Sequence, residues 1–264
     1  YEIIIVAPDE QTLNVGLSYA KNNNRIKILK DPGKGKPNAL NLVFKKVKGD
    51  ILVLTDGDVF VDKKSLIPLI EKFKDPEVGA VTGHPVPTNS KKTMLGYWGN
   101  LLFDIADKRR RKAKELGKRT FCSGYLYAIR NNIIKNIPTE TLSEDGLISH
   151  LIYEKSYKIE YSENSLVYVK YPTKFKDWIA QKKRSVGGYN QIKMWIGKEM
   201  RSFKKESLGI LDVLTYPKNL VEAYYTFVLI LARIYLWFVI FIDINIKKKK
   251  LEKIWVRTAT TKSL

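Results

Sequence analysis

Short apolar runs alternate with amphipathic segments over the first 85 residues of the chain. The apolar runs are continuous, which is typical of strands that are buried on both faces of a sheet. They predict strands over residues 3–6, 26–29, 51–54 and 78–83. The segments between them predict helices over residues 11–22, 38–47 and 64–73. This β-α-β order favours an α/β domain with a doubly wound, mainly parallel sheet.

The pattern changes further along the chain, where helical periodicity dominates. It predicts a long helix over residues 94–116, a strand over 121–129, a helix over 144–157, and short strands over 158–161 and 165–171. After Pro172 the pattern is that of amphipathic helices, with aromatic residues between lysines and arginines. We therefore expect an α/β domain over residues 1–172, with halves 1–85 and 86–172, followed by amphipathic helices over 173–222.

Residues 224–242 are mostly apolar with Arg233 as their only charge, and they would span about 28 Å as a helix, close to the thickness of a bilayer core. Their insertion energy, on the order of −5 kcal/mol, exceeds the roughly +3 kcal/mol cost of a central arginine. We predict a transmembrane or membrane-embedded helix over residues 223–246, although a buried helix of a soluble core has the same pattern. The basic tail over 247–264 begins with four lysines, which places this end and the domain on the cytoplasmic side of the cell membrane.

The amino-acid composition limits the possible partners and metal ions but does not identify a function. The chain has 264 residues and a net charge of +20, which favours anionic partners but also fits a general drift toward lysine. The single cysteine, Cys122, excludes an internal disulfide and is typical of a reducing compartment. Because the two histidines are far apart in sequence, a metal would be held by carboxylates, which indicates Mg²⁺ or Mn²⁺. The chain opens inside a strand without Met, so we expect a preceding segment.

Two segments combine a strand or helix end with residues that suit a phosphate and its metal. Asp56 and Asp58 follow the strand over 51–54, at the end of the sheet where open α/β domains bind ligands. An ordinary turn after a strand would also place Asp-Gly-Asp there. The loop over residues 33–41 carries Lys34, Lys36 and Asn38 at a predicted helix start, where backbone N–H groups favour anions. A solvated loop is the alternative for this segment.

In this order, the motifs resemble those of family 2 glycosyltransferases with the GT-A fold, in the cellulose, hyaluronan and poly-N-acetylglucosamine synthase branch. The resemblance covers nearly the whole chain. The motifs that carry it are the strand over 2–6, Gly-Lys-Gly-Lys-Pro-Asn-Ala-Leu-Asn over 33–41, Thr-Asp-Gly-Asp over 55–58, Phe-Cys-Ser-Gly over 121–124, Ser-Glu-Asp over 143–145, and Gln-Lys-Lys-Arg over 181–184. The family has a first nucleotide-binding strand before the segment that opens this chain. Ser185 stands where the last motif continues with Trp in processive synthases, so processive and single addition both stay open.

The resemblance implies a role for each of these groups. Asp145, beside Glu144, would be the general base of an inverting transfer, and Asp58 with Asp56 would hold Mg²⁺ or Mn²⁺. The resemblance implies a UDP-sugar as the donor. The residues expected on this nucleotide sugar are Asp9, Lys34, Lys36, Asn38, Asp56, Gln181 and Arg184. The residues expected on the acceptor side are Phe121, Cys122, Ser123 and Gly124. The alternative for Glu144 is a capping box with Thr141, which needs no catalysis.

The expected partners are therefore a nucleotide-sugar donor, a saccharide or lipid-linked acceptor and a membrane, with no nucleic acid. The oligomeric state is not predicted. A second hypothesis is a catalytically inactive module that keeps the fold and binds a membrane surface or nucleic acid through the basic run over 108–112. Metal-dependent binding of a nucleoside diphosphate separates the two hypotheses.

Overall fold

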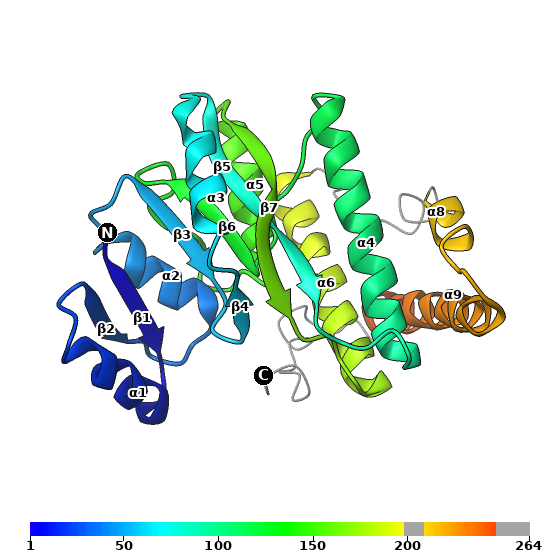
Figure 1. Ribbon diagram of the computed structural model, residues 1–264. Helices are drawn as coiled ribbons and strands as arrows, with labels where there is room; N and C mark the ends of the chain where they lie inside the picture. Colours follow the sequence, from blue (N-terminus) through cyan, green and yellow to red (C-terminus); the bar gives the residue numbers. More distant parts are fainter. Residues whose placement is uncertain (198–208, 247–264) are drawn as a thin grey trace.

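The computed structural model describes residues 1–197 and 209–246 of the chain. The predicted basic tail over 247–264, and residues 198–208 of the predicted amphipathic region, lie outside the described residues. Figure 1 shows an N-terminal lobe in blue, a central sheet, and a helical end built by α4 (Met94–Glu115), α8 (Ile210–Leu214) and α9 (Leu220–Phe241). The active-site candidates come from the lobe, the sheet and the helices behind it.

The strands form two sheets. In the first, β1 (Ile3–Ala7) pairs in parallel with β2 (Ile26–Lys30). The second has the order β3-β6-β5-β7-β4. Its strands are β3 (Ile51–Thr55), β4 (Val59–Val61), β5 (Val78–Pro87), β6 (Leu126–Arg130) and β7 (Lys158–Val169).

The α/β class is confirmed, but the sheet is mixed where a mainly parallel one was predicted. Three pairings, β3 with β6, β5 with β6 and β4 with β7, are antiparallel, whereas β5 and β7 are parallel. Thus β3, β5 and β7 share one direction, and β6 enters between β3 and β5 in the opposite one. The sequence could not show this because an interior antiparallel strand is as continuously apolar as a parallel one.

Several strand predictions differ from the structure, and the strand predicted over 78–83 extends to Pro87. The strand predicted over 121–129 begins only at Leu126, and residues 121–124 form a loop. The two short strands predicted after residue 157 are one strand, β7, with an irregular register where it passes β5. The short strand β4 was not predicted, because the three residues Val59–Val61 are too few to show a period.

The predicted helices are present, and their observed bounds are α1 (Glu10–Ala20), α2 (Lys36–Phe44), α3 (Leu66–Glu71), a 3-10 turn (Lys72–Lys74), α4 (Met94–Glu115), α5 (Glu144–Glu154) and α6 (Phe175–Ile196). The later helices are α8 (Ile210–Leu214) and α9 (Leu220–Phe241), and a π-helical turn (Ile242–Ile246) extends α9. Asp9 begins α1 by accepting a hydrogen bond from the Thr12 N–H at 2.8 Å.

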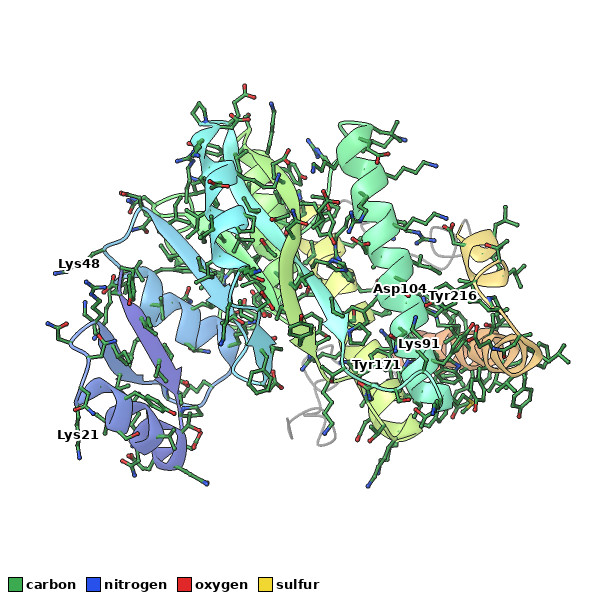
Figure 2. All side chains as sticks on the ribbon, viewed as in Figure 1. Lys21, Lys48, Lys91, Asp104, Tyr171 and Tyr216 are labelled. Atoms are coloured by element: carbon green, nitrogen blue, oxygen red, sulfur yellow. The ribbon has the colours of Figure 1, made fainter. Side chains whose placement is uncertain are left out.

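The helix α9 packs along α4 and α6 and shares a buried apolar cluster with them. Two polar contacts fix its first turns, because Trp98 Nε1 donates to the Tyr225 carbonyl at 2.7 Å and the Tyr97 hydroxyl lies 2.9 Å from Thr226 Oγ1. Just before α9, the Tyr216 hydroxyl contacts Asp104 and Lys91 beside α4 (Figure 2). The predicted membrane helix is therefore attached to the domain along its length.

Candidate active site

The side chain of Lys36 joins three segments that are far apart in the sequence. Lys36 is the first residue of α2. Gly35 before it has a φ of 101°, a backbone conformation that residues other than glycine rarely adopt. Its Nζ lies 2.5 Å from Asp56 Oδ1, 2.8 Å from Glu144 Oε1 and 3.4 Å from the Gly124 carbonyl. The glycine loop, the end of β3, the loop before β6 and the start of α5 therefore meet at one ammonium group.

Asp56 and Asp58, which follow β3, lie near the cluster formed by Lys36, Asp56 and Glu144. The Thr55 hydroxyl donates to the Tyr125 carbonyl at 2.9 Å, which fixes the end of β3 against the start of β6. Burial raises the pKa of Asp56, the Lys36 ammonium opposes this, and the negative charges of Glu144 and Asp58 add to the increase. Acidic side chains thus crowd one another here, and a divalent cation would relieve their repulsion.

The residues Glu144 and Asp145 begin α5 and do not form the alternative capping box. Ser143 is the residue before the helix, and the Thr141 hydroxyl donates instead to the Pro138 carbonyl at 2.6 Å. Asp145 Oδ1 accepts from the Ser143 hydroxyl and from the Gly146 N–H, each at 2.8 Å. Its other oxygen, Oδ2, accepts from the Gly124 N–H at 3.0 Å. The carboxylate of Asp145 is therefore held in one orientation.

The two neighbouring carboxyl groups titrate in opposite directions. Burial opposes ionisation of Glu144, but the charge and hydrogen bond of Lys36 outweigh it and lower the pKa of Glu144. Burial raises the pKa of Asp145, and the charge of Glu144 raises it further. Opposite shifts of paired acids are the pattern from which different roles arise in catalytic sites. Glu144 is the ionised partner of Lys36, and Asp145 is the stronger base.

The predicted acceptor-side residues form the loop between α4 and β6. Burial raises the pKa of the Cys122 thiol to about 12, so this sulfur stays protonated and is a poor nucleophile at neutral pH. Gly124 lies beside the base, where a Cβ atom would sit 3.4 Å from Asp145 Oδ2. A larger side chain at residue 124 would therefore contact the carboxylate of Asp145.

The remaining predicted donor residues belong to α6, to the end of β1 and to the glycine loop. The positive charge of Arg184, on α6, contributes to lowering the pKa of Glu144, so Arg184 belongs to the site, and Gln181 lies one turn earlier on the same helix. Asp9 follows the end of β1, which the Asp31 N–H contacts at the Ala7 carbonyl. Asn38 Nδ2 donates to the Lys34 carbonyl at 3.0 Å, and the Lys34 side chain is exposed. Among the described residues, no hydrogen bond or ion pair joins the Lys34 side chain to Asp56 or Glu144.

Two residues of the site were missed by the sequence reasoning. The hydroxyl of Tyr127 is fully buried and has no hydrogen-bond partner among the described residues. The charges of Lys36, Glu144 and Asp145 act on it, so it lies near the centre. Gln191 of α6 accepts from the Leu142 N–H and donates to the Glu140 carbonyl, each at 2.9 Å, and so fixes the chain just before α5. Nothing in the sequence pattern distinguishes Tyr127 from an ordinary core residue of a strand.

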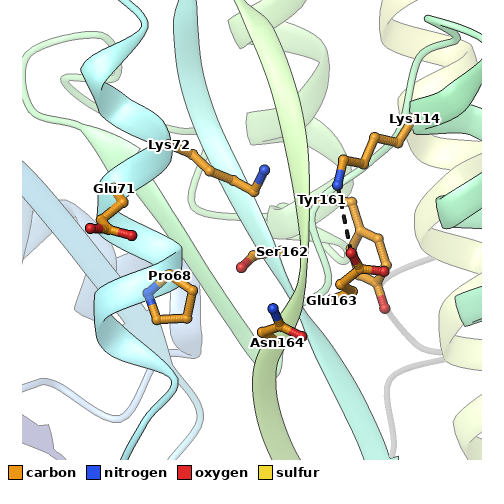
Figure 3. Close-up of a pocket in the computed structure, with 8 residues that line it drawn as sticks. All are labelled: Pro68, Glu71, Lys72, Lys114, Tyr161, Ser162, Glu163 and Asn164. Carbon is orange, nitrogen blue, oxygen red and sulfur yellow. Dashed lines mark ion pairs between the residues drawn. The ribbon is translucent and has the colours of Figure 1, made fainter.

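The cavity drawn in Figure 3 is separate from this centre. It has a volume of about 290 Å³, lies between α3 and β7, and contains none of the predicted site residues. Lys114 on one side of it forms an ion pair with Glu163. Within residues 1–197 and 209–246, no three His, Cys, Asp or Glu side chains gather as a metal site, so a metal would need oxygen atoms from a ligand as well.

Comparisons with known proteins identify the family of the chain and its fold. Residues 2–188 match the family model described as glycosyltransferase like family 2. The chain is 27% identical over 178 residues to poly-beta-1,6-N-acetyl-D-glucosamine synthase of Staphylococcus aureus (strain COL), a match that covers 65% of this chain and 43% of that protein. The synthase of the same name from Staphylococcus epidermidis is 26% identical over 178 residues. The chain thus matches less than half the length of these curated relatives.

Among solved structures, the chain is similar to mannosyltransferase PcManGT from Pyrobaculum calidifontis in complex with GDP-Man and Mn²⁺. The TM-score is 0.57 at 16% sequence identity, and the match covers 96% of this chain and 72% of that one. At this identity the likeness shows the fold alone. It confirms the GT-A type of α/β fold that the order of the motifs predicted.

Proposed function

The chain belongs to glycosyltransferase family 2, and on this premise we propose that it transfers a sugar from a nucleoside-diphosphate donor to a hydroxyl group of a saccharide or lipid-linked acceptor. The observation that carries the proposal is the fixed carboxylate of Asp145 beside the group formed by Lys36, Asp56 and Glu144. The identity of the curated relatives makes UDP-N-acetylglucosamine the first donor to test, and the structural neighbour makes GDP-mannose the second.

Asp145 is the general base in this proposal. The acceptor oxygen attacks the anomeric carbon, its proton passes to Asp145 Oδ2, and the bond between that carbon and the diphosphate oxygen breaks with its electron pair on the diphosphate. Oδ2 accepts one backbone hydrogen bond, from Gly124, and a carboxylate oxygen has a second lone pair for the proton. The raised pKa of Asp145 makes it a better proton acceptor than an exposed aspartate. One direct displacement inverts the anomeric carbon, so an α-linked donor gives a β-glycoside.

The donor side is built from charges of both signs. Arg184 offers paired donors to phosphate oxygens, and Gln181 lies on the same helix, so both suit a diphosphate. Lys36 is paired with Asp56 and Glu144 and keeps the acidic side chains together. Asp56 and Asp58 have the hard oxygen atoms that Mg²⁺ and Mn²⁺ prefer, and such an ion would supply neutralisation of the charge on the departing diphosphate.

The membrane is part of the proposal through α9. This helix is long and apolar enough to cross a bilayer, and only 28% of its most apolar window is buried inside the protein. The large side chains of its outer face, including Phe227, Leu231 and Phe238, are about half exposed or more. We infer that this face lies in lipid and that the catalytic domain lies on the cytoplasmic side of the cell membrane.

The alternative of an inactive basic binding module is less well supported by the contacts of the basic run. Lys108 and Arg109 pair with Asp212, and Arg111 pairs with Asp107 and Glu163. Several positive charges of the run are thus paired with carboxylates of the same chain. Such a surface is a weak site for nucleic acid, whose binding depends on cations that are free to contact phosphates.

Calorimetric titration with UDP and with GDP, each with and without Mn²⁺, tests the proposed function. The wild-type chain should bind one of them only with the metal, and Asp58→Ala should lose this binding. Asp50→Ala is the matched control, because Asp50 is exposed and precedes the opposite end of the same strand. Absence of metal-dependent binding of both nucleotides, or equal loss in the two variants, would contradict the proposal.

A further inference from the structure

The loop before β6 is attached to α5 by a regular series of hydrogen bonds from its backbone. The Gly124 N–H donates to Asp145 Oδ2 at 3.0 Å, the Cys122 N–H to Ser149 Oγ at 2.9 Å, and the Thr120 N–H to the Tyr153 hydroxyl at 3.0 Å. Every second residue of the loop thus meets every fourth residue of the helix. We call these three hydrogen bonds the α5 ladder.

The spacing of the ladder follows from the geometry of the two segments. Four residues of an α-helix advance about 6.0 Å, and two residues of extended chain advance about 6.6 Å. The residues 145, 149 and 153 therefore lie on one face of α5 at intervals that match alternate amides of a chain running beside it in the opposite direction. This match explains why residues 121–124 form a loop here and not the beginning of the strand predicted over 121–129.

The two other side chains of the α5 ladder, Ser149 and Tyr153, are themselves held by further hydrogen bonds. Ser149 is fully buried, and its hydroxyl donates to the Asp145 carbonyl at 2.6 Å while it accepts from the loop. The Tyr153 hydroxyl also donates to the Thr120 carbonyl at 2.7 Å. From the other side, the buried Thr82 hydroxyl accepts from the Ser123 N–H at 2.9 Å. A shift of the loop along α5 would therefore break several buried hydrogen bonds. Each broken bond would leave a buried donor or acceptor without a partner, which costs free energy.

The orientation of the proposed base depends on this loop. Within its own helix turn, Asp145 is held through Oδ1 alone, by Ser143 and Gly146. Its Oδ2, the oxygen to which we assign the proton, is fixed by the Gly124 N–H, whose position the rest of the ladder determines. The Gly124 carbonyl lies 3.4 Å from Lys36 Nζ, so the same peptide also contacts the acidic centre.

We propose that Ser149 and Tyr153 are positioning residues for the transfer reaction, which they serve by holding the loop in the register that orients Asp145. The proposal rests on the proposed function, in which Asp145 is the base. Neither residue touches the donor or acceptor in it. Both act through the Gly124 peptide.

The test compares Ser149→Ala and Tyr153→Phe with Ser165→Ala in the full chain in lipid nanodiscs. Ser165 is the matched control because it is equally buried and its hydroxyl donates to the Ser65 carbonyl at 2.9 Å, in β7 and away from α5. The measured quantities are kcat and donor KM from release of nucleoside diphosphate, and hydrogen exchange of the amides of residues 120–124. We expect kcat to fall about tenfold to a hundredfold in Ser149→Ala, the scale of a misplacement near 1 Å. Tyr153→Phe should lose less, and both should keep the donor KM.

The outcomes separate the two proposals. Faster exchange of residues 120–124 together with a lower kcat in Ser149→Ala, and neither change in Ser165→Ala, supports the positioning role. Equal kcat values in the two serine variants, whether both unchanged or both reduced, overturn it while leaving the proposed function in place. If the wild-type chain shows no turnover with UDP-N-acetylglucosamine or GDP-mannose and binds neither nucleotide, the proposed function fails, and the positioning role fails with it.

Discussion

Lys36 compensates two carboxylates in a partly buried site, so its charge should be important for stability as well as for donor binding. The substitution Lys36→Met keeps most of the length of the side chain and removes the charge. It removes the cation that lies 2.5 Å from Asp56 Oδ1 and 2.8 Å from Glu144 Oε1. The carboxylates of Asp56, Glu144 and Asp145 then remain together without a compensating positive charge from this residue. We predict a loss of about 2–3 kcal/mol in the free energy of unfolding at pH 7, between the values for exposed and buried ion pairs.

The magnitude follows from the distances and the exposure. At an effective dielectric constant of about 20, one pair at 2.8 Å has a Coulomb energy of roughly 6 kcal/mol, most of which is offset by desolvation. Removing one partner of a fully buried pair costs about 3–5 kcal/mol, and of an exposed pair below about 1 kcal/mol. The side chain of Lys36 is 32% exposed and that of Glu144 is 15% exposed, which places the loss nearer the buried case. For a domain of this size the melting temperature should fall by roughly 5–10 °C.

The effect should depend on pH with a definite sign. The folded-state pKa of Glu144 is lowered from 4.5, so the pair stabilises the protein above that value and is lost as the pH falls through the lowered folded pKa. The pKa of Lys36 is raised well above 10.5, so its contribution is complete below 10.5 and is lost only as the pH rises through the raised value. The difference between wild type and Lys36→Met should therefore be large from neutral to mildly alkaline pH and shrink in strong acid.

Thermal unfolding followed by intrinsic fluorescence, at pH 7 and in acid, measures this difference. Lys34→Met is the matched control, because Lys34 lies two residues earlier on the same loop and its side chain is exposed. It should change the melting temperature by less than about 2 °C, as surface substitutions do. Equal melting temperatures for the two variants, or a difference that stays constant in acid, would refute the reasoning.

Three further predictions concern the base, the packing of α6 and the membrane face. Asp145→Asn should bind the donor like wild type and lower kcat by about 100-fold to 10,000-fold, and the wild-type rate should rise with pH through a pKa above the ordinary 3.8 of aspartate. Gly188→Ala should destabilise the protein by about 1–3 kcal/mol, measured by chemical unfolding, because a Cβ atom there would lie 2.6 Å from the Cβ of Ser143. Replacing Phe227 and Phe238 with Ser should reduce flotation with liposomes while leaving the melting temperature near that of wild type, since these side chains are 58% and 59% exposed.

Each of these predictions has a contrary outcome. A turnover of Asp145→Asn close to wild type would show that another group takes the proton. Gly49→Ala is the control for Gly188→Ala, because its nearest new contact is an ordinary 3.6 Å, and equal stability of the two would contradict the packing argument. Leu229→Ser, on the buried face of α9, should lower the melting temperature, and no change would show that α9 does not depend on this contact.

The sequence predicted the parts of the site that depend on local pattern. Asp56 and Asp58 follow a strand whose apolar run is unmistakable, and Glu144 with Asp145 begins a helix at the predicted residue. The partners of Lys36 could not be predicted in the same way. They depend on β6 entering between β3 and β5, and a hydrophobic pattern contains no information about strand order or direction.

The loop over residues 121–124 is a second case in which the local sequence pattern was not sufficient, because it was predicted as a strand. Its sequence has the composition of a strand, and it continues into one at Leu126. Its amides bond to Ser149 and Asp145 instead of to a neighbouring strand, because α5 brings acceptors at the right spacing. Only the position of a helix that is distant in sequence decides between the two, so a local pattern gives the wrong answer here.

The two hypotheses for the apolar segment near residue 230, a membrane helix and a buried core helix, each fit one face of α9. The buried positions, Thr226, Leu229, Ala232, Leu236 and Ile240, recur every three or four residues and pack on α4 and α6. The opposite face is apolar as well, although a helix at the surface of a water-soluble domain would be polar there. A hydropathy average cannot separate these faces, because both raise it.

The attachment of α9 changes what its removal would do. A helix that only anchored the domain would release an intact enzyme when deleted. Deletion of α9 would instead uncover the cluster around Trp98 and Trp178, and the Asp243 carboxylate just beyond it would no longer pair with Lys183, the residue next to Arg184. Because α6 carries both Lys183 and Arg184, the packing of α9 on α6 links the proposed membrane helix to the donor-side arginine. In our proposal the membrane therefore orients the active site as well as anchoring it.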